Sequence, residues 1–110
     1  MARNLFTPDE IALCTFIAVN GRTNFGEEKI VGITNRSLAS ILMKVQNIAA
    51  MLREEGYTCH PSISSLTGLP KGRKERRTNW EIVHNLPLTD KSAFLVLCEN
   101  IFAKYDATQR

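Results

Sequence analysis

Residues 27–52 read EEKIVGITNRSLASILMKVQNIAAML, and this stretch decides the fold that we predict. Its first apolar residues end at Ile33, and Thr34 then turns the chain. Beyond the turn, apolar residues recur at the spacing of one helical face. They are Leu38, Ile41, Leu42, Val45, Ile48, Ala49 and Leu52. A short helix, a tight turn and a longer helix make a helix-turn-helix, which places its second helix in a DNA groove.

The composition sets the broad class of the protein. A chain of 110 residues fits one domain, here 1–110, with a modest core. With 44% hydrophobic and 23% charged residues, it has enough apolar surface to fold. No apolar run reaches the roughly 18 residues of a membrane span, and the start MARNLFTPDE lacks a signal-peptide core. We therefore expect a soluble cytoplasmic protein without a membrane partner.

Positive charge is concentrated in the segment PKGRKERR, residues 70–77, which we call the basic segment. Five cations opposed only by Glu75 give it a formal charge of +4, against +3 for the whole chain, so the remainder sums to −1. The cations are Lys71, Arg73, Lys74, Arg76 and Arg77. A local cluster of this kind can neutralise several phosphates and give salt-dependent, sequence-independent affinity for nucleic acid. A solvated loop that only aids solubility is the plainer interpretation.

The string FTPDEI, from residue 6, matches a helix start position by position. Thr7 suits the cap, Pro8 the first helical position and Glu10 the reciprocal place in a capping box. The helix that follows has apolar residues around more than half of its circumference, and it should end at Asn20-Gly21. Such a helix belongs in the middle of a small core.

The helices of the central stretch have predicted ends as well. The first should run from about Asn24 to about Ile33. The second should be capped by Thr34 and end near Glu55, because Gly56 supplies a left-handed stop.

The last third of the chain leaves alternatives open. Residues 62–66 fit a short strand, and residues 80–84 fit either a short helix capped by Thr78 or a strand. Two strands would make the basic segment the wing of a winged helix. Trp80 suggests an anchor that docks this segment onto the helices. A final helix from about Thr89 should pack on the first and third helices through one face, formed by Phe94, Leu97, Cys98, Ile101 and Tyr105.

Catalytic and metal-binding patterns are poor. An odd count of three cysteines, two of them in apolar company, indicates buried reduced thiols. The adjacent Cys59 and His60 have no second ligand pair at zinc spacing. No Walker loop, nucleophile elbow or His–Glu–x–x–His motif occurs. We predict no enzyme, no metal and no cofactor.

The corner GITNRSLASIL, residues 32–42, resembles the bihelical core of the sigma-factor region-four and response-regulator output families. The matching positions are Ile33, Thr34, Leu38, Ser40 and Leu42. The resemblance implies that six side chains face the groove, namely Asn35, Arg36, Ala39, Ser40, Met43 and Lys44. Ala39 and Met43 are apolar where those families carry more arginine and lysine. They could read a base only by apolar contact, for instance with a thymine methyl group.

A second resemblance covers more of the chain. KVQNI at 44–48, TGLP at 67–70 and RTNW at 77–80 look like parts of a small helical module at the front of bacterial restriction-type endonucleases. The same module is associated with stand-alone reading frames near those enzymes. The resemblance implies a DNA-recognition module whose catalytic domain is supplied elsewhere. It also singles out Lys44, Gln46 and Asn47 as polar residues within a largely apolar helix.

Together these observations predict a mainly α, compact four-helix domain with a central helix-turn-helix and an optional small β wing. The predicted function is a non-catalytic module that binds double-stranded DNA in restriction, defence or transcription regulation of bacterial or phage type. The predicted DNA-binding residues are Asn35, Arg36, Ser37, Ser40, Met43, Lys44, Asn47, Lys71, Arg73, Lys74, Arg76, Arg77 and Asn79.

Other interpretations stay open at this point. A plain helical hairpin in a small bundle would give the same corner. A protein-interaction adaptor or inhibitor of phage or plasmid type would use apolar positions of the long helix, at Ala39, Met43, Ala50 and Met51. Either a monomer or a dimer is compatible with the pattern.

Overall fold

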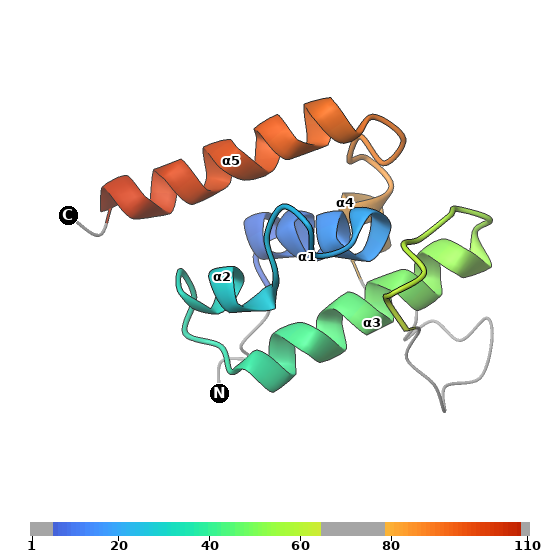
Figure 1. Cartoon of the computed structure of the whole chain (residues 1–110), viewed down its shortest axis with the longest axis horizontal. Coiled ribbons are helices and arrows are strands. Elements are labelled where there is room, and N and C mark those ends of the chain that lie inside the picture. Colours follow the sequence, from blue (N-terminus) through green and yellow to red (C-terminus); the bar gives the residue numbers. More distant parts are fainter. Residues whose placement is uncertain (1–5, 65–78, 109–110) are drawn as a thin grey trace.

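The computed structural model describes residues 6–64 and 79–108, with side chains for 6–64 and 79–105. Within these ranges the chain forms five α-helices and no strand (Figure 1). They are α1 (Pro8–Asn20), α2 (Glu27–Val31), α3 (Leu38–Glu54), α4 (Trp80–Val83) and α5 (Lys91–Thr108). The mainly helical class is therefore confirmed, with five helices where we predicted four.

The predicted wing is not found in the described part of the chain. Residues 80–84 form the short helix α4 and its C-terminal cap, so the strand alternative for them is wrong. Of the other predicted strand, 62–66, the described residues 62–64 are not in a strand, and the remainder lies outside the described ranges.

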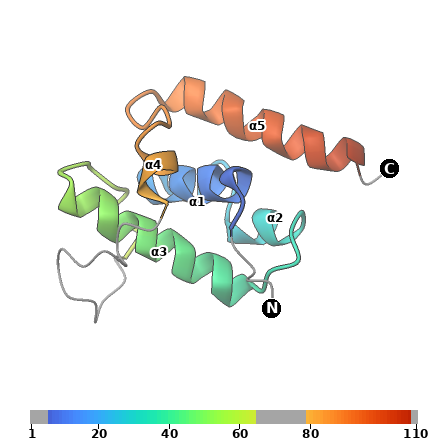
Figure 2. The ribbon, with the colours of Figure 1, turned by 180° about the vertical axis from the view of Figure 1, so that it is seen from behind.

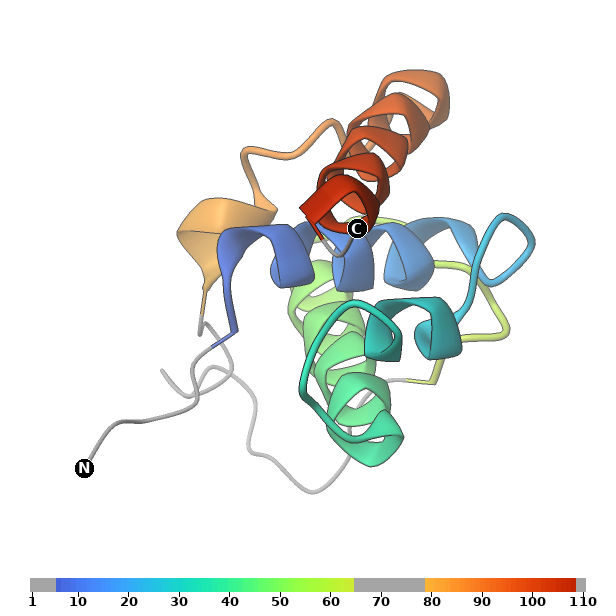
Figure 3. The ribbon, with the colours of Figure 1, turned by 90° about the vertical axis from the view of Figure 1, so that its left-hand side faces the viewer.

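The helix α1 lies at the centre of the fold, as its apolar girth predicts. It contacts all four other helices, with α5 on one side and α3 on the other (Figures 1 and 2). The view along α5 in Figure 3 shows the same order of layers. Every residue of α1 from Glu10 to Ala18 is buried. The central stretch 27–52 therefore packs around α1, which is the element that organises the molecule.

The ends of α1 form as the sequence predicts. The Thr7 backbone N–H donates to Glu10 Oε1 at 2.8 Å, and the Glu10 backbone N–H donates to Thr7 Oγ1 at 3.2 Å, which completes a capping box. Pro8 occupies the first turn, where its missing N–H costs nothing. Gly21, at φ 82°, ends the helix.

The corner between α2 and α3 differs from the prediction. The helix α2 starts after Gly26 rather than near Asn24, and residues 32–37 separate it from α3. Ser37 caps α3, because its Oγ accepts the Ser40 backbone N–H at 3.2 Å. The predicted cap at Thr34 is therefore wrong. The connection is longer than the roughly three-to-four-residue turn of a standard helix-turn-helix. At the other end, Gly56 at φ 89° stops the helix as predicted.

Aromatic rings join the layers. The Phe16 ring stacks on Phe25 with centroids 5.1 Å apart, and it meets the edge of Phe94 at 5.2 Å. Phe25 in turn meets Phe102 at 5.0 Å. The predicted inner face of α5 packs on α1, whereas α3 lies on the far side of α1. None of the helices in the described ranges combines the length and apolarity needed to span a bilayer.

Candidate nucleic-acid interface

The first turns of α3 present an uncharged surface to solvent. Asn35, Ser37, Leu38, Ala39, Ser40 and Met43 are all exposed. Leu38 keeps 41% and Met43 keeps 56% of its surface accessible, which is unusual for large apolar side chains. Asn35, Ala39, Ser40 and Met43 are thus accessible to a partner, and their place in a DNA groove stays a prediction. We call this set, Asn35 and 37–40 with Met43, the α3 front.

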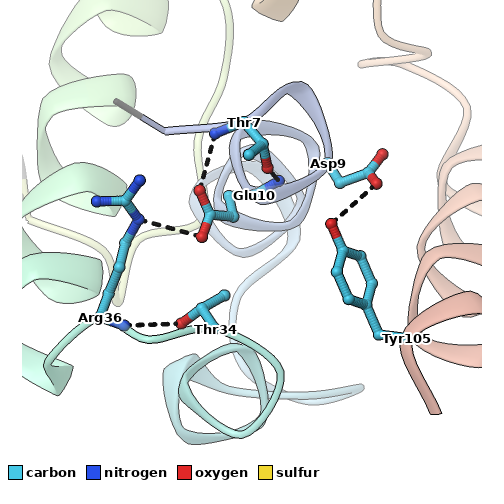
Figure 4. A network of polar contacts seen from close by, with 6 residues as sticks. All are labelled: Thr7, Asp9, Glu10, Thr34, Arg36 and Tyr105. Atoms are coloured by element: carbon cyan, nitrogen blue, oxygen red, sulfur yellow. Dashed lines mark hydrogen bonds and ion pairs between the residues drawn. The ribbon is translucent and has the colours of Figure 1, made fainter. Parts of the chain in front are cut away.

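Arg36 does not belong to that surface (Figure 4). Its Nε donates to Glu10 Oε2 at 3.1 Å, and both side chains are about nine-tenths buried, at 10% and 11% exposure. The guanidinium carbon lies 3.8 Å from the centre of the Phe6 ring. The Arg36 backbone N–H donates to Thr34 Oγ1 at 3.2 Å. The prediction that Arg36 faces the groove is wrong, because the carboxylate of Glu10 holds the side chain inside.

Lys44 is also turned inward, against the prediction. Only 8% of its surface is exposed, and its Nζ donates to Asn79 Oδ1 at 2.8 Å. The same nitrogen lies 5.2 Å from the centre of the Phe6 ring. Burial lowers the pKa of Lys44, and the nearby Arg36 cation lowers it further. No carboxylate of the described residues forms an ion pair with it.

A shallow hollow of about 300 Å³ opens at this point on α3. It is lined by Phe6, Ser40, Met43, Lys44 and Asn47. We call it the Lys44 hollow. It brings together four of the predicted DNA-binding residues. Asn47 also has a buried Oδ1, a hydrogen-bond acceptor, that has no partner among the described residues.

Sequence reasoning missed the part that Phe6 plays in this site. Residue 6 precedes the cap of α1, and its position suggests only local packing on the first turn of that helix. No spacing relates it to residues 36 and 44. The side chains of Arg36 and Lys44, which are distant from Phe6 in the sequence, both lie over its ring. These contacts depend on how α1 and α3 cross.

After the basic segment, Asn79 bonds to α3 through Lys44, and the helix α4 packs on α1. Asn79 has a left-handed backbone, with φ 68°, and occupies the capping position of α4 that we predicted for Thr78. Trp80 is half-buried against the core, as expected of an anchor, and its ring lies 6.2 Å from Tyr57 and 5.8 Å from His84 between centroids. A second open hollow of about 480 Å³ is lined by residues 79–82.

The basic segment itself lies outside the described residues. This applies to five predicted DNA-binding residues, namely Lys71, Arg73, Lys74, Arg76 and Arg77. Asn79, the second residue after Arg77 in sequence, is the described residue that marks where the segment meets the fold.

The cysteines are free and buried, as predicted. Burial raises the pKa of the Cys14 and Cys98 thiols to about 12 and also raises the pKa of Cys59. Over the ranges 6–64 and 79–105, no three His, Cys, Asp or Glu side chains gather as metal ligands would.

Comparison with protein families, with curated proteins and with solved structures gives no match to this chain. Its functional assignment therefore depends on the residues and contacts described above.

Proposed function

We propose that this protein is a non-catalytic module that binds duplex DNA, with the α3 front turned toward the groove and the basic segment supplying most of the affinity. The two resemblances noted in the sequence support a setting in restriction, defence or transcription regulation. A catalytic partner domain would then be a separate unit.

The observation that carries this proposal is the hydrogen bond between Lys44 and Asn79. It ties the residue two positions after Arg77 to the middle of α3, at a nitrogen–oxygen distance of 2.8 Å. A cluster of cations and a helix must lie near each other to contact the same duplex. Asn79, two residues beyond Arg77 in the sequence, lies against the helix that carries the α3 front, and this supports a duplex contact shared by the two segments.

The lack of charge on the α3 front assigns different tasks to the two segments. Phosphate contacts come from lysine and arginine, which the basic segment has in excess. Asn35 can hydrogen-bond to base edges, and Met43 can contact a thymine methyl group. The expected binding is consequently strong in its salt dependence and modest in its sequence preference.

The first test is fluorescence anisotropy of a labelled duplex across a salt series. Replacing Arg73, Lys74, Arg76 and Arg77 by alanine should weaken binding to all sequences alike. It should also flatten the slope of log affinity against log salt, by up to about 0.9 for each phosphate that is no longer neutralised. The matched control changes Arg73, Arg76 and Arg77 to lysine, which keeps the charge and should keep most of the affinity.

Two results would contradict the proposal. One is the absence of binding at low salt by the unaltered protein. The other is an affinity that does not respond to salt.

If the protein binds DNA, selection of bound duplexes from a random pool will show whether the α3 front adds a preference for particular bases.

One observation favours a protein-interaction module as the second candidate. The α3 front has no charged side chain, and it exposes Leu38 and Met43 at 41% and 56%. The other apolar positions predicted for this role, Ala50 and Met51, are buried and do not contribute. A stoichiometric protein partner that is captured equally well by the four-fold alanine variant would favour this candidate over DNA binding.

A further inference from the structure

Among the described residues, the Lys44 side chain is a buried cation without a counter-charge. Lysine is among the residues least often buried, and when it is buried it is normally paired with a carboxylate. Here the only polar atom of the described residues in hydrogen-bond range of Nζ is the neutral amide oxygen of Asn79. An ammonium group has three donors, and this contact uses one of them.

Glu10, the carboxylate that pairs with the neighbouring Arg36, is already engaged. Glu10 accepts the Thr7 backbone N–H with Oε1 and the Arg36 Nε with Oε2. Arg36 and Glu10 offset each other, and Lys44 adds one further positive charge beside them. The three side chains leave a net charge of about +1 that is held away from bulk water, where an anion is attracted more strongly than at an exposed site.

Lys44 is one of the residues that line the Lys44 hollow, and the other lining residues suit an oxyanion. Ser40 contributes a hydroxyl and Asn47 an amide, and both can donate hydrogen bonds. The rest of the lining is apolar, from Phe6 and Met43. A backbone phosphate of DNA has this mixed character, because its charged oxygens are flanked by the carbon faces of two sugars.

We propose that the Lys44 hollow binds one phosphate group, with Lys44 as its counter-charge and Ser40 and Asn47 as hydrogen-bond donors. The phosphate is a backbone phosphate of duplex DNA, and this part of the assignment rests on the proposed function. A phosphate contact at mid-helix fixes how α3 lies along the groove, and it carries no sequence information itself. Lys44 and Asn47 are then positioning contacts rather than readers of bases.

The test uses Lys44→Gln, which keeps a donor for Asn79 and removes the charge, with the exposed Lys91→Gln on α5 as the control. The first measurement is thermal unfolding in inorganic phosphate against sodium chloride at equal ionic strength. Because phosphate also stabilises folded proteins in general, only the difference between variants counts. At about ten times its Kd, bound phosphate should raise the Tm of the unaltered protein and of Lys91→Gln by about 6 °C more than that of Lys44→Gln.

The second measurement is anisotropy with a labelled duplex. The Kd of Lys44→Gln should rise by about three- to tenfold for every sequence alike. The slope of log affinity against log salt should fall by about one, as expected when one phosphate contact is removed. Lys91→Gln should leave both quantities unchanged.

Each outcome decides between the two levels of the proposal. An equal phosphate response in all three proteins overturns the phosphate site. A Lys44-dependent response with unchanged DNA binding by Lys44→Gln leaves a free-phosphate site and overturns its assignment to the DNA backbone. A Lys44-dependent response in a protein that binds no DNA keeps the site and rejects the proposed function.

Two further variants protect the test against loss of folding. Lys44→Met replaces the uncompensated charge by an apolar chain of similar length, so its Tm in chloride should equal or exceed that of the unaltered protein. Ser40→Ala changes an exposed hydroxyl and should fold normally while its phosphate response shrinks. A full response in both variants would count against the hollow as the binding site.

Discussion

Arg36 shows how a single side chain can fix a corner. It joins the connection before α3 to the first turn of α1 through Glu10, which is also the reciprocal residue of the capping box. Phe6 shields one face of the guanidinium. One carboxylate thus serves a helix end and a long-range ion pair, and the exit of α2 cannot move away from α1 without breaking the Arg36–Glu10 ion pair. Arg36, which the sequence resemblance implied to be a DNA contact, instead stabilises the packing of the α2–α3 connection on α1.

We predict that Arg36→Ala lowers the free energy of unfolding by about 3 kcal/mol, because it leaves the Glu10 carboxylate buried without its cation. Urea denaturation followed by circular dichroism measures this loss. Arg36→Lys keeps the charge but not the flat guanidinium over Phe6, so it should recover only part of the stability. A loss below about 0.5 kcal/mol, the size of an exposed ion pair, would mean that the pair is not formed in solution.

At the scale of elements, the sequence predicts the helix ends that depend on neighbouring residues alone. Thr7 and Glu10 form the capping box of α1, and Gly56 stops α3. The predicted start of α3 is at the wrong residue, because Thr34 and Ser37 are both cap-type residues. Thr34 instead makes a local turn with the Arg36 backbone. The choice between them depends on Glu10, 26 residues away from Arg36, which a local pattern cannot contain.

The two cap candidates give a matched pair of variants. Ser37→Ala should lower the free energy of unfolding by about 1 kcal/mol, because the Ser40 backbone N–H loses its acceptor. Thr34→Ala removes only a turn contact and should cost less than half as much. Thermal unfolding of both variants measures the difference. If Thr34→Ala lowered the free energy of unfolding more than Ser37→Ala, Thr34 rather than Ser37 would be the N-cap of α3.

At the scale of the whole molecule, α1 holds α3 and α5 on opposite sides. The central place of α1 could be predicted from a helix that is apolar over more than half its circumference. The opposite placing of α3 and α5 is not predicted, because the last helix is expected to pack on the third helix as well. The candidate site could be predicted only in part. The exposure of Asn35, Ala39, Ser40 and Met43 agrees with what the family resemblance implies, whereas Leu38, which the periodicity places on the apolar face, is 41% exposed. The inward turn of Lys44 depends on Phe6 and Asn79, which come from distant parts of the sequence and meet only when the helices pack.

The α5 layer offers a test of this three-layer core. Phe94 is fully buried against Phe16, whereas Val96, on the same helix, keeps 54% of its surface exposed. Phe94→Ala should lower the free energy of unfolding by about 3–5 kcal/mol through lost burial and the cavity left behind. Val96→Ala should change it by less than about 0.5 kcal/mol. Equal effects of the two substitutions in urea titrations would show that α5 does not dock on α1 as described.

Each layer of the fold carries one buried thiol. Cys14 belongs to α1, Cys59 follows α3, and Cys98 belongs to α5. Burial raises the pKa of all three thiols and shields them from solvent. Alkylating reagents can therefore modify a thiol only after local or global unfolding exposes it. The protein thus contains three native reporters of opening, and their separate rates of modification would give the order in which α5, the end of α3 and the central helix part from one another.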